Sequence, residues 1–269
     1  MNDTVAITRT LRRCALGAGE ILLDYFGGLT NPRQKESPSS IVCDADLAAE
    51  AFILKQLQKT FPDHGIISEE SGRIMGKSEY TWVVDPLDGT SNFVARLPWF
   101  GVLMGVLRGT TPIAAVMYRP TEKVLYSAEA GGGARRNGKP VRVSAETNLK
   151  NVLCAFGFDP AAAKRNRHDV ELLFRVSQAV RNVRTTNSLV DFCYTLEGGF
   201  GACINLKTKI WDIVPISLIL PEAGGKFTDL DGRKISFRLD DRVCEREYKV
   251  LGANRPLHSI LVKLIRSGR

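Results

Sequence analysis

The segment 85–91 contains the residue types that point most directly to chemistry. Asp85 and Asp88 lie three residues apart at the end of an apolar run, with the carbonyl of Leu87 between them. If the chain turns tightly here, these oxygen atoms converge, and oxygen ligands favour Mg²⁺, Mn²⁺ or Ca²⁺ over zinc or copper. Gly89 follows directly, and a glycine lets a bound group approach the backbone closely.

Thr90 and Ser91 would add an anion site if a short helix begins there, because the first N–H groups of a helix have no partner inside it. A plain turn is the alternative, since Asp, Pro and Gly are common turn residues. For this segment alone the turn is the better interpretation, so the choice depends on acidic residues elsewhere.

Acidic residues in three other places fit the same chemistry. Glu69 and Glu70 follow an apolar run and could supply one ligand and one base, although such a pair is usually a solvated loop. Asp46 lies at the start of an expected helix, and Asp212 has the place of a helix N-cap. Capping or the helix dipole would explain both without catalysis. Together with 85–91, however, these carboxylates favour a site for a hard cation and a phosphate.

Composition limits the class of protein. The chain has 269 residues, enough for one large core or two tightly joined subdomains. No apolar run approaches the roughly 20 residues of a membrane-spanning helix, and the first residues do not resemble a signal peptide. The six cysteines form no C-x-x-C pair, so we expect reduced thiols and a cytoplasmic protein.

The net charge of +8 is compatible with nucleic acid or with anionic substrates. The basic residues are spread along the chain and are not interleaved with aromatic residues, as they are on single-strand-binding surfaces. We therefore expect a solvated basic surface and no nucleic-acid partner. His64, His168 and His258 are isolated and show no metal-ligand spacing.

Apolar residues recur with helical and strand periods in separate blocks. The helical periods predict helices over residues 3–25, 46–59, 167–180, 188–196, 213–220 and 256–266. The strand periods predict strands over residues 64–68, 80–84, 100–108, 111–118, 123–129, 151–156, 202–206, 226–228 and 248–251. Because strands and helices do not alternate strictly, this order favours a layered α/β sandwich of mixed sheets over a doubly wound parallel sheet.

A change of composition near residues 140–150 predicts a boundary between two subdomains. Residues 1–145 would form an N-terminal α+β subdomain with most candidate metal ligands. Residues 146–269 would form an α/β subdomain with Asp212 and the leaving-group pocket. In the second helix, we expect one apolar, buried face formed by Leu47, Ala51, Leu54 and Leu57.

The chain resembles the inositol monophosphatase family of metal-dependent phosphatases in segments that follow the family's order. Residues 84–93, VDPLDGTSNF, resemble its D-P-[IL]-D-G-T-x-N-F signature, and residues 66–71, IISEES, resemble its G-E-E-S segment. Residues 211–212, with EAGG at 222–225, resemble its W-D…E-A-G-G signature. The resemblance covers nearly the whole chain.

This resemblance implies a five-layered αβαβα fold, a homodimer, and Mg²⁺-dependent hydrolysis of a phosphate monoester that lithium inhibits. Lys35 lies eleven residues before Asp46, as the family's lysine lies before its aspartate. By this resemblance, Lys35 would lie beside the metals. Arg184, within the segment 181–190, would lie near the dimer contact. Two or three Mg²⁺ ions, with Mn²⁺ as a substitute, would be held by Glu69, Asp85, the Leu87 carbonyl, Asp88 and Asp212.

The resemblance also implies roles for the residues around the metals. Thr90, paired with Asp46, would orient and deprotonate the attacking water, and Glu70 would hold a water on a metal ion. Phosphate and substrate would contact Gly89, Thr90, Asn187, Ser188, Asn205 and Asp212.

Two departures from the family pattern concern the substrate. Asn205 stands where the family has a glutamate that contacts inositol, and Asn187 where it often has glycine. An amide carries no charge and hydrogen-bonds a polyol differently. Inositol monophosphate is the default substrate. Fructose 1,6-bisphosphate, histidinol phosphate and a 3′-phosphorylated nucleotide are the enzymatic alternatives, and a regulatory RNA-associated binding protein is the alternative of another class.

Overall fold

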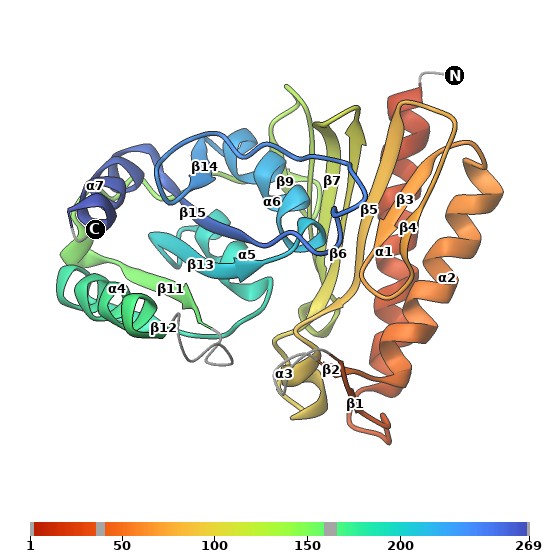
Figure 1. Ribbon diagram of the computed structural model, residues 1–269, viewed down its shortest axis with the longest axis horizontal. Helices are drawn as coiled ribbons and strands as arrows, with labels where there is room; N and C mark the ends of the chain where they lie inside the picture. Colours follow the sequence, from red (N-terminus) through yellow and green to blue (C-terminus); the bar gives the residue numbers. More distant parts are fainter. Residues whose placement is uncertain (1–2, 36–40, 159–165, 268–269) are drawn as a thin grey trace.

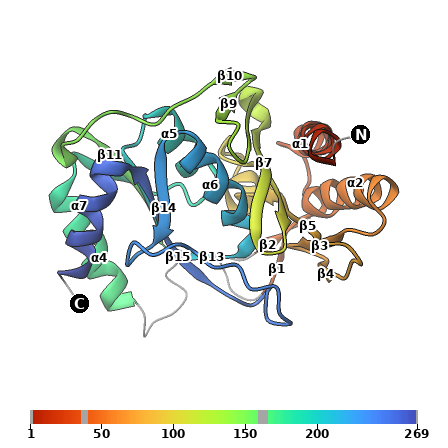
Figure 2. The same cartoon turned by 90° about the horizontal axis from the view of Figure 1, so that it is seen from above.

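The computed structural model describes residues 3–35, 41–158 and 166–267 (Figure 1). Helices and sheets form layers that pack against one another through three hydrophobic cores, and Figure 2 shows these layers from above. The layers run in the order helix pair, large sheet, helix pair, small sheet, helix pair. The expected αβαβα sandwich of mixed sheets is therefore confirmed.

The first helix pair, α1 (Asp3–Tyr25) and α2 (Asp44–Thr60), covers one face of the large sheet. This sheet has eight strands in the order β10-β9-β8-β7-β6-β5-β3-β4, and only β3 and β5 pair in parallel. Its strands are β3 (Gly65–Ser68), β4 (Gly72–Ile74), β5 (Tyr80–Asp88), β6 (Gly101–Arg108), β7 (Thr111–Arg119), β8 (Val124–Glu129), β9 (Ala134–Arg136) and β10 (Lys139–Pro140).

The middle helix pair, α5 (Val190–Glu197) and α6 (Ile210–Glu222), lies between the two sheets. The small sheet has five strands in the order β12-β11-β13-β15-β14. Its far face is covered by α4 (Asn166–Ala179) and α7 (Arg255–Arg266). The strands are β11 (Leu153–Gly157), β12 (Asn182–Arg184), β13 (Ala202–Thr208), β14 (Gly225–Asp229) and β15 (Tyr248–Asn254).

The remaining described elements are short. The strands β1 (Arg33–Gln34) and β2 (Ile41–Val42) pair with each other, and α3 (Thr90–Val94) follows β5 directly. No helix in the described ranges is long and apolar enough to cross a membrane. The central core takes side chains from both 1–145 and 146–269, and the division at residue 145 stays a prediction.

The expectation for Leu47 is wrong, because 41% of this residue is exposed. The buried face of α2 instead includes two acidic residues, Asp46 and Glu50, together with Ala49 and Ile53. An apolar pattern could not locate this face, because part of it is built from carboxylates.

Candidate active site

The first two candidate ligands lie at the end of β5, where the strand is irregular. Alternate residues of β5 face the two sides of the sheet, so Val83 packs into the central core while Val84 packs against the first helix pair. Asp85 continues the face of Val83. The register with β6 shifts between Asp85 and Asp88, and the N–H of Leu87 donates to Asp85 Oδ1 at 3.1 Å.

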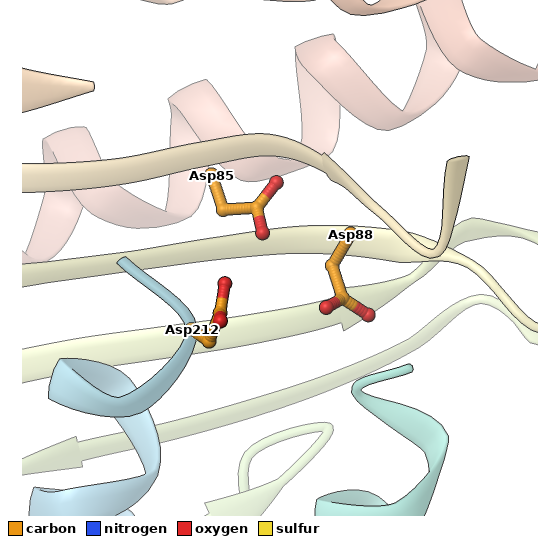
Figure 3. Close-up of side chains that lie close together, drawn as sticks. All are labelled: Asp85, Asp88 and Asp212. Carbon is orange, nitrogen blue, oxygen red and sulfur yellow. The ribbon is translucent and has the colours of Figure 1, made fainter. Parts of the chain in front are cut away.

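The third carboxylate comes from the N-terminus of α6. One oxygen each of Asp85, Asp88 and Asp212 lie within 4.8 Å of one another, and Figure 3 shows the three carboxyl groups gathered from β5 and α6. The expectation that Asp212 is the N-cap is wrong. The N-cap is Lys209, whose N–H donates to Asp212 Oδ2 at 2.7 Å, as in a capping box. This bond fixes one carboxylate oxygen and leaves the other for the cluster.

Glu69 and Glu70 follow β3, the strand that pairs in parallel with β5. The Lys35 ammonium lies 2.8 Å from Glu69 Oε1 and 2.5 Å from Glu70 Oε1. Burial lowers the pKa of Lys35, but the two glutamates outweigh this effect and raise the pKa above its ordinary value. Lys35 is therefore charged and offsets part of the acidic charge.

The acidic cluster is electrostatically unfavourable by itself. Burial raises the pKa of Asp85, and the negative charges of Glu69, Asp88 and Asp212 raise it further. Burial and its neighbours also raise the pKa of Asp88, and the pKa of Asp212 rises to about 7. A set of buried oxygen ligands that repel one another fits a hard divalent cation, which would relieve this repulsion.

Asp46, which is buried, and Thr90, which is half-buried, form a pair beside this cluster. Thr90 Oγ1 lies 2.9 Å from Asp46 Oδ1 and 3.0 Å from the carbonyl oxygen of Leu87. Asp46 Oδ2 accepts from the backbone N–H and the thiol of Cys43, at 2.9 and 2.8 Å. Asp46 is only 1% exposed, and burial raises its pKa. The start of α2 thus holds Asp46 so that one oxygen faces Thr90.

The expected short helix begins at Thr90, and Gly89 is its N-cap, with φ of 83°. A Cβ atom on Gly89 would lie 2.5 Å from the carbonyl oxygen of Trp99. Only glycine fits this left-handed conformation and close approach. Gly89, Thr90 and Ser91 line the same cavity as the carboxylates.

One cavity of about 590 Å³ joins most of the candidate residues. Asp46 and Glu70 are not part of its lining; they lie behind Thr90 and beside Lys35. The candidate residues that line it are Lys35, Glu69, Asp85, Leu87, Asp88, Gly89, Thr90, Asn187, Ser188, Asn205 and Asp212.

Another part of the cavity wall contains both asparagines. Asn187 has φ of 50°, a conformation that asparagine tolerates better than most residues, and its amide pairs with the N–H and carbonyl of Phe158, both at 3.1 Å. The Asn187 side chain thus shapes the wall, with its amide satisfied by the backbone. Asn205 Oδ1 accepts from the N–H of Lys207 at 3.1 Å. Lys207 and Lys209 also line the cavity.

Two buried carboxylates near the site were not anticipated. Asp191 accepts from Thr186 Oγ1 at 2.7 Å, and burial raises its pKa to about 7. Glu50 lies one helical turn after Asp46 on the same face of α2. The spacing of four residues was the available signal for Glu50.

Comparisons with known proteins agree with this arrangement. The inositol monophosphatase family model matches residues 3–268. The chain is 31% identical over 256 residues to the fructose-1,6-bisphosphatase/inositol-1-monophosphatase of Aquifex aeolicus, covering 93% of this chain and 91% of that protein. It is 34% identical over 225 residues to Nus factor SuhB of Escherichia coli K12, covering 82% and 84%.

The fold agrees as well. The crystal structure of the extragenic suppressor protein suhB from Bartonella henselae superposes with a TM-score of 0.88 at 28% identity, covering 98% of this chain and 100% of that chain. The family match spans both sheets and all the segments that supply the site. The chain belongs to the inositol monophosphatase family.

Proposed function

We propose that this protein is a Mg²⁺-dependent phosphatase that hydrolyses a small phosphate monoester. The observation that carries the proposal is the convergence of Asp85, Asp88 and Asp212 within 4.8 Å, in the cavity that Gly89 and Thr90 also line. Membership of a generally metal-dependent family supports it. We propose inositol monophosphate as the leading substrate.

The residues suit two or three Mg²⁺ ions, with Mn²⁺ as a substitute. Bound there, the ions would neutralise the phosphoryl oxygens and acidify the attacking water. Their ligands would be Glu69, Asp85, the Leu87 carbonyl, Asp88 and Asp212.

The chain's own groups account for the proton and for the position of the phosphate. Thr90 Oγ1 would take a proton from the attacking water while passing its own to Asp46 Oδ1, 2.9 Å away. The amides of Gly89 and Thr90 would donate to phosphate oxygens. Ser188 and Asn205 would face the leaving group. Glu70, held by Lys35, would position a water at the cluster.

A panel of phosphate esters in Mg²⁺ tests this proposal. We expect phosphate release from inositol monophosphate, and at least a hundredfold loss in Asp88→Asn, because removal of a metal ligand weakens charge stabilisation. Asp169→Asn is the matched control, since Asp169 is buried and pairs with Lys249 away from the cavity. If the protein hydrolyses no small ester, or if Asp88→Asn keeps the full rate, the proposal is wrong.

A bisphosphate is the second candidate substrate class. Lys207 and Lys209 line the cavity wall beside Asn205, and two cationic side chains there suit a leaving group with its own phosphate. The Aquifex relative is named for both activities. Fructose 1,6-bisphosphate, histidinol phosphate and adenosine 3′,5′-bisphosphate therefore belong in the same panel.

A regulatory RNA-associated role is the candidate from another class. The name Nus factor of the Escherichia coli relative and the net charge of +8 are its support. RNA binding that persists in EDTA and in Asp88→Asn, with a steep dependence on salt, would favour it. Binding that requires the metal site would not.

We also propose a cytoplasmic homodimer that lithium inhibits. Arg184 lies on β12, an edge strand of the small sheet with exposed side chains, and we place the segment 181–190 near the dimer contact. Analytical ultracentrifugation of the wild type and Arg184→Ala tests the dimer. Titration of the activity with LiCl tests the inhibition.

A further inference from the structure

Helix α2 carries a second buried carboxylate, Glu50, one turn after Asp46. Residues four apart on a helix lie on one face, so both side chains point from α2 toward the large sheet. Glu50 is 5% exposed, and no lysine or arginine in the described part of the chain forms an ion pair with it. A buried, unpaired carboxylate needs hydrogen bonds to offset its desolvation.

Among the described residues, the donors to Glu50 all lie in one short segment, residues 68–71. Glu50 Oε1 accepts from the hydroxyl of Ser68, from the N–H of Glu70 at 3.2 Å and from the N–H of Ser71 at 3.0 Å. Glu50 Oε2 accepts from the hydroxyl of Ser71 at 2.6 Å. The carboxylate therefore closes the turn that contains Glu69 and Glu70.

The same turn connects β3 with β4, and Ser68 pairs with Gly72 of β4 and with Val84 of β5. The N–H of Glu69 donates to the carbonyl oxygen of Val84 at 3.2 Å. Lys35 contacts the side chains of Glu69 and Glu70. Without Glu50, the amides of Glu70 and Ser71 would lose a charged acceptor, and the part-buried hydrogen bonds that hold this turn to α2 would be lost.

Electrostatics alone would not favour a carboxylate at this place. The negative charge of Glu50 is one of the smaller effects that raise the pKa of Glu70, after burial and Glu69. The four hydrogen bonds that Glu50 accepts offset this repulsion and are the benefit of a carboxylate at this position.

We propose that Glu50 is a positioning residue that fixes the backbone at 68–71, so that the Glu69 carboxylate faces the cluster of Asp85, Asp88 and Asp212. It would touch neither metal nor substrate. This inference rests on the proposed function, since it takes Glu69 as a metal ligand. Helix α2 would then contribute two residues to the site, Asp46 and Glu50.

Metal binding without substrate tests this role directly. Free Mn²⁺, followed by electron paramagnetic resonance, reports the affinity of each variant without turnover. We expect Glu50→Ala to weaken Mn²⁺ binding by about 10- to 100-fold, the usual effect of losing a group that orients a ligand. Glu50→Gln should stay within about threefold of the wild type, because its amide oxygen still accepts the two N–H groups.

Glu222→Ala is the matched control. Glu222 accepts from the N–H groups of Gly131 and Gly133 at 2.7 and 2.8 Å, so it also closes a turn, but at the end of α6 opposite to Asp212. We expect it to lower the melting temperature while leaving Mn²⁺ affinity within about twofold. Equal loss of affinity in Glu222→Ala and Glu50→Ala would assign the effect to general destabilisation and overturn the proposal.

Hydrogen exchange supplies the second readout. The amides of Glu70 and Ser71 should exchange faster in Glu50→Ala than in Glu50→Gln. If Glu50→Ala does not fold, the double variant Ser68→Ala/Ser71→Ala tests the same hydrogen bonds. We expect this double variant to weaken Mn²⁺ binding by at least about threefold. Unchanged Mn²⁺ binding would overturn the role of Glu50. A wild type that binds no Mn²⁺ would instead refute the proposed function.

Discussion

The Asp46→Asn variant separates the transfer of a proton from metal binding. An asparagine has nearly the same shape, and its amide oxygen can accept the N–H and thiol of Cys43 as Asp46 Oδ2 does. Its NH₂ group would then face Thr90 Oγ1, 2.9 Å from the present position of Asp46 Oδ1. The Thr90 hydroxyl would donate to the Leu87 carbonyl oxygen instead, at 3.0 Å. Thr90 would have no group to receive its proton.

The expected loss in kcat is that of a general base, about 10²- to 10⁴-fold. This corresponds to about 2.7–5.4 kcal/mol at 1.36 kcal/mol per tenfold. Stability should change little, because the buried carboxylate of Asp46 already has a raised pKa and asparagine carries no charge to desolvate.

Phosphate release at saturating Mg²⁺ measures kcat, and Mn²⁺ binding measures the metal site. Thr90→Ala and the double variant complete the set; since the two residues act as one unit, their losses should not add. Asp169→Asn again controls for the loss of a buried carboxylate. A kcat within about threefold of the wild type would refute the assignment of Asp46 as proton acceptor, and so would full additivity.

Three further predictions concern stability and selectivity. Without metal, the pKa of Asp212 is about 7 in the folded state and 3.8 when unperturbed. The contribution of Asp212 to stability therefore falls as pH rises between these two values. Melting curves in EDTA should show this fall, and Mg²⁺ should remove it. Gly89→Ala should lower the free energy of unfolding by at least about 1–2 kcal/mol, because residue 89 has a left-handed conformation and its Cβ atom would lie 2.5 Å from the Trp99 carbonyl oxygen. A melting temperature equal to that of the wild type would contradict this prediction. Asn205→Glu should lower kcat/KM for fructose 1,6-bisphosphate relative to kcat/KM for inositol monophosphate, because a carboxylate beside Lys207 offsets the positive charge of this part of the wall. An unchanged ratio of the two kcat/KM values would show that this wall does not select the substrate.

The sequence predicts the residues of the proposed metal and phosphate site better than the residues that would contact the rest of the substrate. The spacing of Asp85 and Asp88 predicts that they converge, although both lie in β5 and a shift of register with β6, rather than a turn, separates them. Gly89 marks the close approach. Asp212 is harder, because its distance from Asp85 depends on how α6 packs between the two sheets. Its N-cap position was mistaken because Asp212 acts as the acidic partner of the capping box at Lys209.

The role of Asn187 could not be predicted, because it depends on long-range contacts. Its amide pairs with Phe158, 29 residues away, and this pairing exists only once β11 and the turn before α5 are in place. The buried face of α2 escaped prediction for a related reason. Hydrophobic periodicity assumes apolar side chains against the sheet, whereas Asp46 and Glu50 are buried through hydrogen bonds to groups that other segments supply.

The two halves of the cavity rest on different parts of the fold. The carboxylates and Thr90 belong to β5, α2, α3 and α6, which are anchored in the cores on both faces of the large sheet. The other part of the wall is formed by the turn at 185–188, the end of β13 and the segment at 244–245, which add few side chains to those cores. The two parts of the cavity are in contact, because the N–H of Leu189, directly after that turn, donates to Asp88 Oδ2. We therefore expect a substitution at 185–188 to affect both the leaving group that fits and the position of Asp88.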